Sequence, residues 1–444
     1  MHRAFLSALS VFALTAPAAW AGAGGGTSGY SGGGGYSGGG SSSSYYSGGS
    51  SGSGGSLSTG SGLLDILIIF GVILLFSMST ILAGLRMRHY RHKRAERVKK
   101  VAAAAAEAAE DDPVFASDAV SKSAADLYLA CQRAWTKNDI PTLETMVGHD
   151  LMLEWRRRLQ DFQVKGWHNV VEVANRPDVE YLGLVNREGS DEDRVVVRIS
   201  AIQEDYVVND QGVKFDKQGS SSTTVKVEEW WTLARKDDRW IVLSIEQDLE
   251  GMHNLDTALV ARPDADEERL HDAATVEVAQ DDAAPADVKT SEIADLDFAG
   301  DARAAAMDLS LADARFAPDV LEVAVRRAVA GWAEAIDGAD GALLAVAAPD
   351  AAHALLYPDG GESLRMVVRG PVVRHLRITK LDAAHDPAQM SVEVDVNGRR
   401  YVENRATAAV VSGSKDKSTD FTERWTLAID GPADNPWRII SAAH

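Results

Sequence analysis

One stretch of the chain is apolar without interruption, whereas the remaining apolar residues recur with helical or strand periodicity. Residues 66–85 form a run of 20 residues without a charged side chain. A helix of that length rises about 30 Å, which is the thickness of the hydrocarbon core of a bilayer. The run therefore predicts a single transmembrane helix, placed at residues 63–85, with Asp65 at its outer edge.

Apolar residues in two later segments fall on one helical face each, with the spacing i, i+4, i+7, i+11 and i+14 in both. They are Val120, Ala124, Leu127, Cys131 and Ala134 in the first segment, and Leu321, Val325, Ala328, Trp332 and Ala335 in the second. Each segment begins after an Asp-x-x-Phe motif, at Asp112 and Asp313, and has a tryptophan near its end, at Trp135 and Trp332. The two segments are predicted to be equivalent helices of an internal repeat.

The later half of each repeat alternates with a period of two, which is typical of strands. Asn397-Gly398 predicts a tight hairpin between two such runs, and residues 209–212 predict a looser turn at the matching place. The sequence Trp-Thr-Leu-Ala occurs at Trp231 and again at Trp425, each time followed by a second tryptophan-containing strand. Each repeat thus predicts an α+β fold in which helices pack on one face of a curved antiparallel sheet and form a cone.

The N-terminus has the composition of an export signal followed by a low-complexity segment. Residues 1–21 combine a basic start, an apolar stretch and small residues before Gly22, so cleavage there is expected, with an uncleaved signal anchor as the alternative. Residues 22–62 hold 19 Gly, 14 Ser and 4 Tyr. Such a segment buries too little apolar surface to offset the entropy of ordering. We expect it to be disordered, either as a spacer or as a segment whose tyrosines make weak contacts.

Charge is distributed unevenly around the apolar run and predicts its orientation. The net charge of −20 argues against nucleic-acid binding, but residues 86–100 carry eight Lys or Arg against one acid, and residues 22–62 carry no charge. The positive-inside rule places the folded part in the cytoplasm of a bacterial inner membrane, with the Gly/Ser-rich segment outside. Five cations are predicted to contact anionic lipid headgroups, with a purely topological role as the alternative. They are Arg86, Arg88, Arg91, Lys93 and Arg94.

These patterns divide the chain into seven segments. They are a signal peptide at 1–21, a disordered segment at 22–62, a transmembrane helix at 63–85, a basic juxtamembrane segment and spacer at 86–111, a cone domain at 112–250, an acidic linker at 251–306, and a second, diverged cone domain at 307–444. The linker is assigned because residues 256–306 carry 14 acidic against 4 basic residues and show no strong periodicity. An alternative is that this acidic stretch contacts the basic juxtamembrane segment.

The first repeat resembles a known family at several motifs. They are the Asp-Pro-x-Phe start at Asp112, the sequence QRAWTKND from Gln132, a Lys-Gly-Trp turn at Lys165, and the closing strands at Trp231 and Trp240. Over residues 112–249 the chain is similar to the mitochondrial import inner membrane translocase subunit 44-like domain. That resemblance implies a nuclear-transport-factor-2-like cone fold and a membrane-associated tethering role. Members of the family recruit a chaperone motor or hold a ribosome at the membrane, and contact cardiolipin.

Motifs for catalysis or cofactor binding are missing from the sequence, so we expect a non-enzymatic protein without a cofactor or metal. The histidines lack the spacing of metal ligands, and no phosphate-binding or dinucleotide-binding glycine motif occurs. An alternative is a small-molecule sensor or an enzyme with a pocket in one cone. Four sheet residues are candidates for that pocket, although we expect them to face solvent because burying a carboxylate is costly. They are Asp205, Tyr206, Asp395 and Tyr401.

Two further predictions concern single side chains. Cys131 is the only cysteine, which excludes a disulfide within the chain, and its place on the helical stripe predicts a buried thiol. Trp230 and Trp231 are adjacent on a strand, so one points outward and is predicted to contact a protein partner, with cover by the same domain as the alternative. The expected function is a membrane-anchored scaffold or tether that binds a protein partner, in membrane-protein biogenesis or translocation.

Overall fold

The structure is a computed structural model that describes residues 22–28, 30, 62–215, 222–280, 296–335 and 340–443. The predicted signal peptide and residues 29 and 31–61 of the predicted disordered segment lie outside the described residues. The chain forms two compact units. One contains residues 32–99, and the other contains residues 1–31 together with residues 100–444.

A single helix, α1, runs from Gly62 to Asp111 over 50 residues. It includes the predicted transmembrane helix, the basic segment and the alanine-rich stretch at 102–106, whose residues have the highest helix propensity. Within the described residues, no helix is long and apolar enough to cross a membrane.

The five basic residues predicted to contact lipid all lie on α1. Arg86, Arg88 and Arg91 are exposed, and Lys93 and Arg94 are half-buried. Their contact with lipid remains a prediction.

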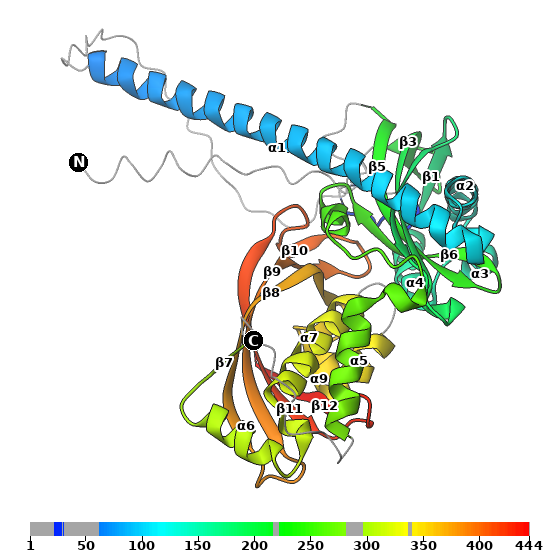
Figure 1. Cartoon of the computed structure of the whole chain (residues 1–444). Helices are drawn as coiled ribbons and strands as arrows, with labels where there is room; N and C mark the ends of the chain where they lie inside the picture. Colours follow the sequence, from blue (N-terminus) through cyan, green and yellow to red (C-terminus); the bar gives the residue numbers. More distant parts are fainter. Residues whose placement is uncertain are drawn as a thin grey trace. The chain divides into compact units, whose positions relative to one another are not determined.

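The first repeat folds as three helices and a six-stranded antiparallel sheet (Figure 1). The elements are α2 (Ser117–Thr136), α3 (Ile140–Met146), α4 (His149–Val164), β1 (Trp167–Val173), β2 (Asp178–Val185), β3 (Arg194–Asn209), β4 (Lys214–Phe215), β5 (Thr224–Lys236) and β6 (Arg239–Gln247). The order is β1-β3-β5-β6, and β2 and β4 also pair with β3. We call this the first domain.

The second repeat also places three helices before its sheet, but β7 and α6 precede them, and we call it the second domain (Figure 1). Its elements are β7 (Leu296–Phe298), α6 (Ala302–Ser310), α7 (Pro318–Glu334), α8 (Asp340–Val346), α9 (Pro349–Leu356), β8 (Leu364–Asp382), β9 (Gln389–Asn404), β10 (Val410–Gly413), β11 (Thr419–Ile429) and β12 (Trp437–Ala443). The order is β12-β11-β9-β8-β7, with β10 paired to β9.

Equivalent contacts occur in the two segments predicted to form a repeat. The Asp112 carboxylate accepts a hydrogen bond from the Val114 amide at 3.0 Å, and Asp313 accepts one from the Arg315 amide at 3.0 Å. The phenylalanine that follows packs edge-on against the tryptophan of the last strand. This ring pair is Phe115 with Trp240 in the first domain and Phe316 with Trp437 in the second, with 5.7 Å between ring centroids in both.

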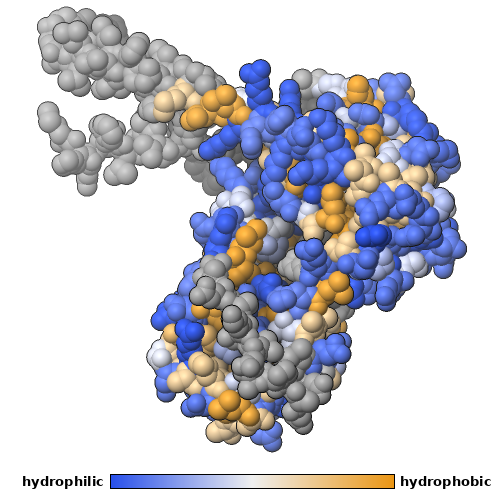
Figure 2. Space-filling model, in the orientation of Figure 1, coloured by the Kyte–Doolittle hydropathy of each residue, from blue (hydrophilic) through white to orange (hydrophobic). Residues whose placement is uncertain are grey.

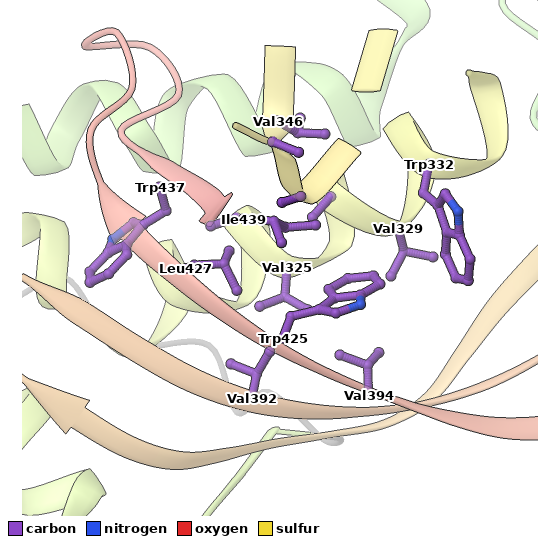
Figure 3. Close-up of a cluster of buried hydrophobic side chains, with 14 of the residues drawn as sticks. Val325, Val329, Trp332, Val346, Val392, Val394, Trp425, Leu427, Trp437 and Ile439 are labelled. Atoms are coloured by element: carbon purple, nitrogen blue, oxygen red, sulfur yellow. The ribbon is translucent and has the colours of Figure 1, made fainter. Parts of the chain in front are cut away.

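Both predicted helical stripes are buried. All ten stripe residues are buried on α2 and α7, or directly after α7 in the case of Ala335. In the second domain, Trp425 lies among Val325, Val392 and Val394 (Figure 3). Cys131 is fully buried, and burial raises the pKa of its thiol, which confirms the predicted core cysteine.

The predicted hairpin at Asn397-Gly398 is wrong. Both residues lie inside the continuous strand β9, where Asn397 pairs with Val372 of β8 on one side and with Asp420 of β11 on the other. A turn there would break hydrogen bonds to two strands. The looser turn at residues 209–212 is confirmed, because β3 ends at Asn209 and Gly212 has a φ of +77°.

The segment predicted as an acidic linker contains regular structure. A short 3-10 helix η3 (Glu250–Leu255) covers β5, and α5 (Glu267–Gln280) packs on α7, where Arg326 bonds Asp272 at 3.1 Å. Strand β7 extends the sheet of the second domain, pairing in parallel with β8. The net acidity of this segment does not prevent folding, because some of its carboxylates pair with arginines of the domains.

Candidate functional site

A cavity of about 110 Å³ lies between the two domains. We call it the interdomain pocket. The first domain lines it with residues of α4, β5, β6 and η3, and the second domain lines it with residues of β8, β9 and the turns that follow β9 and β10. Residues 22–26 and 28 line the rest of it. The charged side chains of its lining are Glu154, Arg158, Glu229, Glu250, Arg365, Arg369, Glu403, Arg405 and Lys415.

Glu154 of α4 is the centre of one buried charge cluster. Its Oε1 accepts hydrogen bonds from Arg405 Nε at 2.7 Å and from Arg365 Nη1 at 3.2 Å. All three residues are buried. Burial by itself lowers the pKa of the Arg405 guanidinium, but the bond to Glu154 reverses this and raises it. A carboxylate of the first domain therefore holds two arginines of the second.

Glu403 of β9 forms the reverse arrangement, in which the second domain supplies the acid. Its carboxylate bonds Arg158 of α4 at 2.7 Å, and Lys415 bonds its other oxygen. Burial alone raises the pKa of Glu403, yet the charges of Lys415 and Arg158 lower it to about 2. Glu403 is thus an anion at neutral pH, locked between two cations.

A third cluster joins the 3-10 helix η3 to the second domain. Glu250 accepts hydrogen bonds from the Tyr401 hydroxyl at 2.5 Å and from Arg369 Nε at 3.3 Å. Arg369 also lies 3.3 Å from Glu246, which contacts His253 at 3.0 Å. Burial raises the pKa of the Tyr401 hydroxyl, and the nearby Glu250 raises it further.

The interior of the first domain is polar beside the pocket. Trp135 Nε1 donates to Asn169 Oδ1 at 2.8 Å, and Asn169 Nδ2 donates to Asp205 Oδ1 at 2.8 Å. Glu229 accepts from Trp231 Nε1 at 2.9 Å. Burial raises the pKa of Glu229 to about 7, with a further upward contribution from the charge of Asp205. Two acids therefore lie close together inside this cone.

Of the four sheet candidates, the structure buries Asp205 and Tyr401 and leaves Tyr206 and Asp395 half-buried on the outer faces. The predicted solvent-facing position is wrong for Asp205 and Tyr401. Strand alternation directs Asp205 into the first cone, whereas Tyr401 lies on the outer face of β9 and is buried there by the first domain. Donors compensate the burial: Asn169 for Asp205, and Arg369 for the Glu250 that holds Tyr401. The four do not form one site, since they are divided between two domains.

Neither Trp230 nor Trp231 is exposed. Trp231 is part of the core of the first domain. Trp230 points to the other face of the sheet, where η3 covers it and its Nε1 donates to the Asp248 carbonyl at 3.0 Å. On the face of the molecule drawn in Figure 2, hydrophilic residues dominate and apolar ones form small, separate groups. The structure favours cover by the same domain over contact with a partner through these tryptophans.

Residues 22–28 and 30 are not disordered in the structure, contrary to the prediction. They pack on the pocket, where the Ala23 amide donates to Gln132 Oε1 at 2.8 Å and the Ser28 amide donates to the Thr407 carbonyl at 3.0 Å. Arg158 also donates to the Gly24 carbonyl. The Gly/Ser-rich composition did not predict this docking, because the contacts use main-chain groups, which glycine supplies as well as any residue.

Sequence reasoning missed the pocket because its partners are distant in the chain. Glu154 is 211 residues from Arg365 and 251 residues from Arg405. The sequence does carry one signal, because Tyr401 and Glu403 lie two residues apart near the end of β9 and Arg405 follows two residues later. That spacing puts Tyr401 and Glu403 on one face of the strand. Among the described residues, no group of three or more His, Cys, Asp or Glu side chains is arranged to hold a metal ion.

Comparisons with known proteins agree with the resemblance of the first domain. The family model of the Tim44-like domain matches residues 101–247, so this part of the chain is similar to that family. The match begins before the predicted boundary at residue 112, inside α1. No curated protein matches the chain. A solved structure, an Ntf2-like protein involved in plasmid conjugation, is similar at 10% identity over 69% of this chain and 86% of that one, with a TM-score of 0.16.

Proposed function

We propose that the protein is a non-enzymatic scaffold or tether, and that its two domains bind a protein partner at the interdomain pocket. The observation that carries this proposal is the pocket itself, which is lined in part by residues 22–28, a peptide segment bound to both domains through main-chain hydrogen bonds. A surface that already binds polypeptide backbone is suited to a protein ligand. The similarity to the Tim44-like family supports a role in tethering rather than in chemistry.

The proposed site of action is the bacterial inner membrane, where residues 66–85 anchor the chain by one span and place residues 86 onward in the cytoplasm. The supporting observation is the charge asymmetry, eight cations against one acid at residues 86–100. Exposed Arg86, Arg88 and Arg91 on α1 contact anionic headgroups in this proposal. The resemblance favours membrane-protein biogenesis or translocation as the process.

A site-specific crosslinking experiment in intact membranes tests the proposed binding surface. A photoreactive side chain is placed at Lys415, which lines the pocket, and in a matched variant at Lys380, which is exposed on β8 outside it. We expect a protein partner to be captured at position 415 and to be at least about tenfold depleted at position 380. Equal capture at the two positions would count against the pocket as the binding surface.

A second candidate function is small-molecule binding inside the first cone. It is favoured by the two buried acids, Asp205 and Glu229, which lie beside the aromatic rings of Trp135 and Trp231. A ligand of this site would raise the thermal stability of the full chain and would lose that effect in Asp205→Asn. Ligands that stabilise both chains equally would exclude this site.

A further inference from the structure

The contacts of the docked segment require particular residue types at particular positions. At Gly24 the backbone has a φ of +88°, and an added Cβ would collide with the ring of Trp155. At Gly26 an added Cβ would collide with the Thr407 carbonyl group. Only glycine fits these two places without movement of the pocket walls, because every other residue carries a Cβ.

Larger side chains are accepted further along the segment, at Thr27 and Tyr30. Thr27 contacts Asp161 and Lys165 of the first domain. Tyr30 is buried, its hydroxyl donates to Asp205 Oδ1 at 3.1 Å, and its ring lies 6.5 Å from that of Phe162. The pocket therefore combines a narrow channel for two glycines with an aromatic anchor site.

The wall of the channel also carries buried polar atoms directed at the segment. Gln132 Nε2, Gln203 Nε2 and Trp155 Nε1 are buried and have no hydrogen-bond partner among the described protein atoms. A Cβ built at Gly22 would lie 3.4 Å from Gln203 Nε2 and 3.5 Å from Gln132 Nε2. These three donors therefore lie beside the segment without bonding to it.

We propose that the interdomain pocket is a binding site for a glycine-rich peptide segment that ends in an aromatic anchor, and that residues 22–28 and 30 are its built-in occupant. This goes beyond the proposed scaffold role, because the segment docks whether or not a partner protein exists. A span at residues 66–85 would place the segment and the pocket on opposite sides of a bilayer. Docking and insertion therefore exclude each other in one chain, and insertion leaves the pocket free for another ligand.

The test uses the full chain in detergent micelles, where no bilayer separates the segment from the pocket. A labelled synthetic peptide with the sequence of residues 22–30, GAGGGTSGY, is added to the wild type and to the double variant Gly24→Val with Gly26→Val. The variant's own segment no longer fits, so its pocket is open. We expect the peptide to bind the variant at least about tenfold more tightly than the wild type, whose attached segment competes at high effective concentration.

Two matched controls define the specificity. The variant Ser28→Ala keeps the main-chain bond to Thr407 and should exclude the peptide as the wild type does. A peptide carrying the change Gly26→Val should not bind the double variant. Equal binding of the labelled peptide to the wild type and the double variant, or no binding to the double variant, overturns the proposal.

A disulfide provides a second measurement that does not depend on peptide affinity. The hydrogen bond from Ser28 to Thr407 brings the two residues within reach of a bridge, and the native Cys131 is buried. In micelles, Ser28→Cys with Thr407→Cys should crosslink within one chain, whereas Ser28→Cys with Lys380→Cys should not. Failure of the first pair to crosslink overturns docking.

The same pair in reconstituted vesicles separates this proposal from the proposed topology. If docking holds and residues 66–85 cross the bilayer, the crosslink forms in micelles and is lost in vesicles. If it forms equally in both, docking stands and the single-pass topology is wrong. If it forms in neither, docking is wrong, and the scaffold proposal is left to the Tim44-like match and to the capture experiment at position 415.

Discussion

At the strand position where the first domain carries Asp205, the second domain carries Arg400. The tryptophan of the Trp-Thr-Leu-Ala motif pairs with a valine in each domain: Trp231 with Val197, and Trp425 with Val392. Asp205 and Arg400 each lie eight residues beyond that valine. The buried glutamate two residues before that tryptophan therefore meets opposite charges in the two domains. Glu229 meets an acid that raises its pKa. Glu423 meets Arg400 at 3.2 Å.

The tryptophans also have polar partners in the first domain and aromatic partners in the second. In the first domain, Trp135 and Trp231 each donate a hydrogen bond, to Asn169 and Glu229. In the second, their counterparts Trp332 and Trp425 pack edge-on at 5.8 Å, and their indole nitrogens have no partner among the described atoms. The helix facing them is polar in the first domain and apolar in the second. In the register of the two stripes, Tyr128 corresponds to Val329 and Gln132 corresponds to Ala333.

This difference shows how one fold serves two purposes. Apart from the pair of Glu423 with Arg400, the second domain uses its interior for apolar packing, which stabilises the fold (Figure 3). The first domain keeps polar groups beside the pocket, and the segment at 22–30 bonds to two of them, Gln132 and Asp205. Polar groups in such a place contribute specificity when they are satisfied. We infer that the second domain acts chiefly as the rigid wall of a site built on the first.

The largest effect is expected on removing a core tryptophan of the second domain. Trp425→Ala deletes a buried ring that packs on Trp332 and on the sheet, so the free energy of unfolding should fall by about 4 kcal/mol. Urea unfolding of the full chain, followed by circular dichroism, measures the loss. Trp167→Ala is the control, because Trp167 is only half-buried. An equal loss in both variants would contradict the closely packed interior.

The next effect tests how the two domains are held together. Glu154→Gln leaves Arg365 and Arg405 buried without their shared anion, which should cost about 3 kcal/mol. The cost should be visible as a lower urea midpoint of the full chain and as faster proteolysis between the domains. Glu144→Gln on α3 removes an exposed carboxylate and should change stability by less than about 0.5 kcal/mol. A Glu154→Gln chain as stable as this control would show that the cluster does not join the domains.

Periodicity predicted the frame of both domains, because each stripe or alternating run depends on a local geometric repeat. All ten stripe residues are buried for that reason. Asn397-Gly398 misled the prediction because the local turn preference of this pair yields to pairing with strands on both sides. A dipeptide preference of about 1 kcal/mol cannot outweigh several lost sheet hydrogen bonds.

The pocket was beyond prediction because it depends on contacts between residues more than 200 positions apart, such as Glu154 with Arg405. The sequence shows which strand face carries Tyr401 and Glu403, but not which surface that face meets. Likewise, composition identified residues 22–62 as glycine-rich, but the fit of Gly24 and Gly26 depends on walls supplied by Trp155 and Thr407.

Two opposite substitutions, one in each domain, test the polarity difference directly. Val329→Gln places an amide in the apolar interior of the second domain, where a cost of about 2 kcal/mol is expected from an unsatisfied polar group. Gln132→Val in the first domain removes a polar group and should leave the free energy of unfolding within about 0.5 kcal/mol of the wild type. The same change should weaken docking of residues 22–30, because the Ala23 amide loses its acceptor. Equal costs in both directions would show that the interiors do not differ.

The smallest effect is a pH dependence that only the first domain should show. Burial holds the pKa of Glu229 at about 7 in the folded chain, well above the ordinary value of a glutamate carboxyl. Between these values the folded state binds more protons than the unfolded state, so stability falls as the pH rises. From about pH 6 to about pH 7.5 the fall due to Glu229 should be about 1 kcal/mol. The measurement is the free energy of unfolding of the wild type and of Glu229→Gln at each pH. The difference between the two chains isolates Glu229, because both share the same histidines.

Two variants decide whether the charge at the position shared by Asp205 and Arg400 causes this pH dependence. Asp205→Asn removes the like charge beside Glu229, so the pKa of Glu229 should move toward its ordinary value and the fall in stability should shift to lower pH. Glu423→Gln breaks the ion pair with Arg400 and should leave the pH-dependent fall from Glu229 unchanged. If Asp205→Asn leaves the pH profile where it was, burial alone sets the pKa of Glu229. The contrast between Asp205 and Arg400 would then concern recognition of the docked segment, through Tyr30, rather than proton binding.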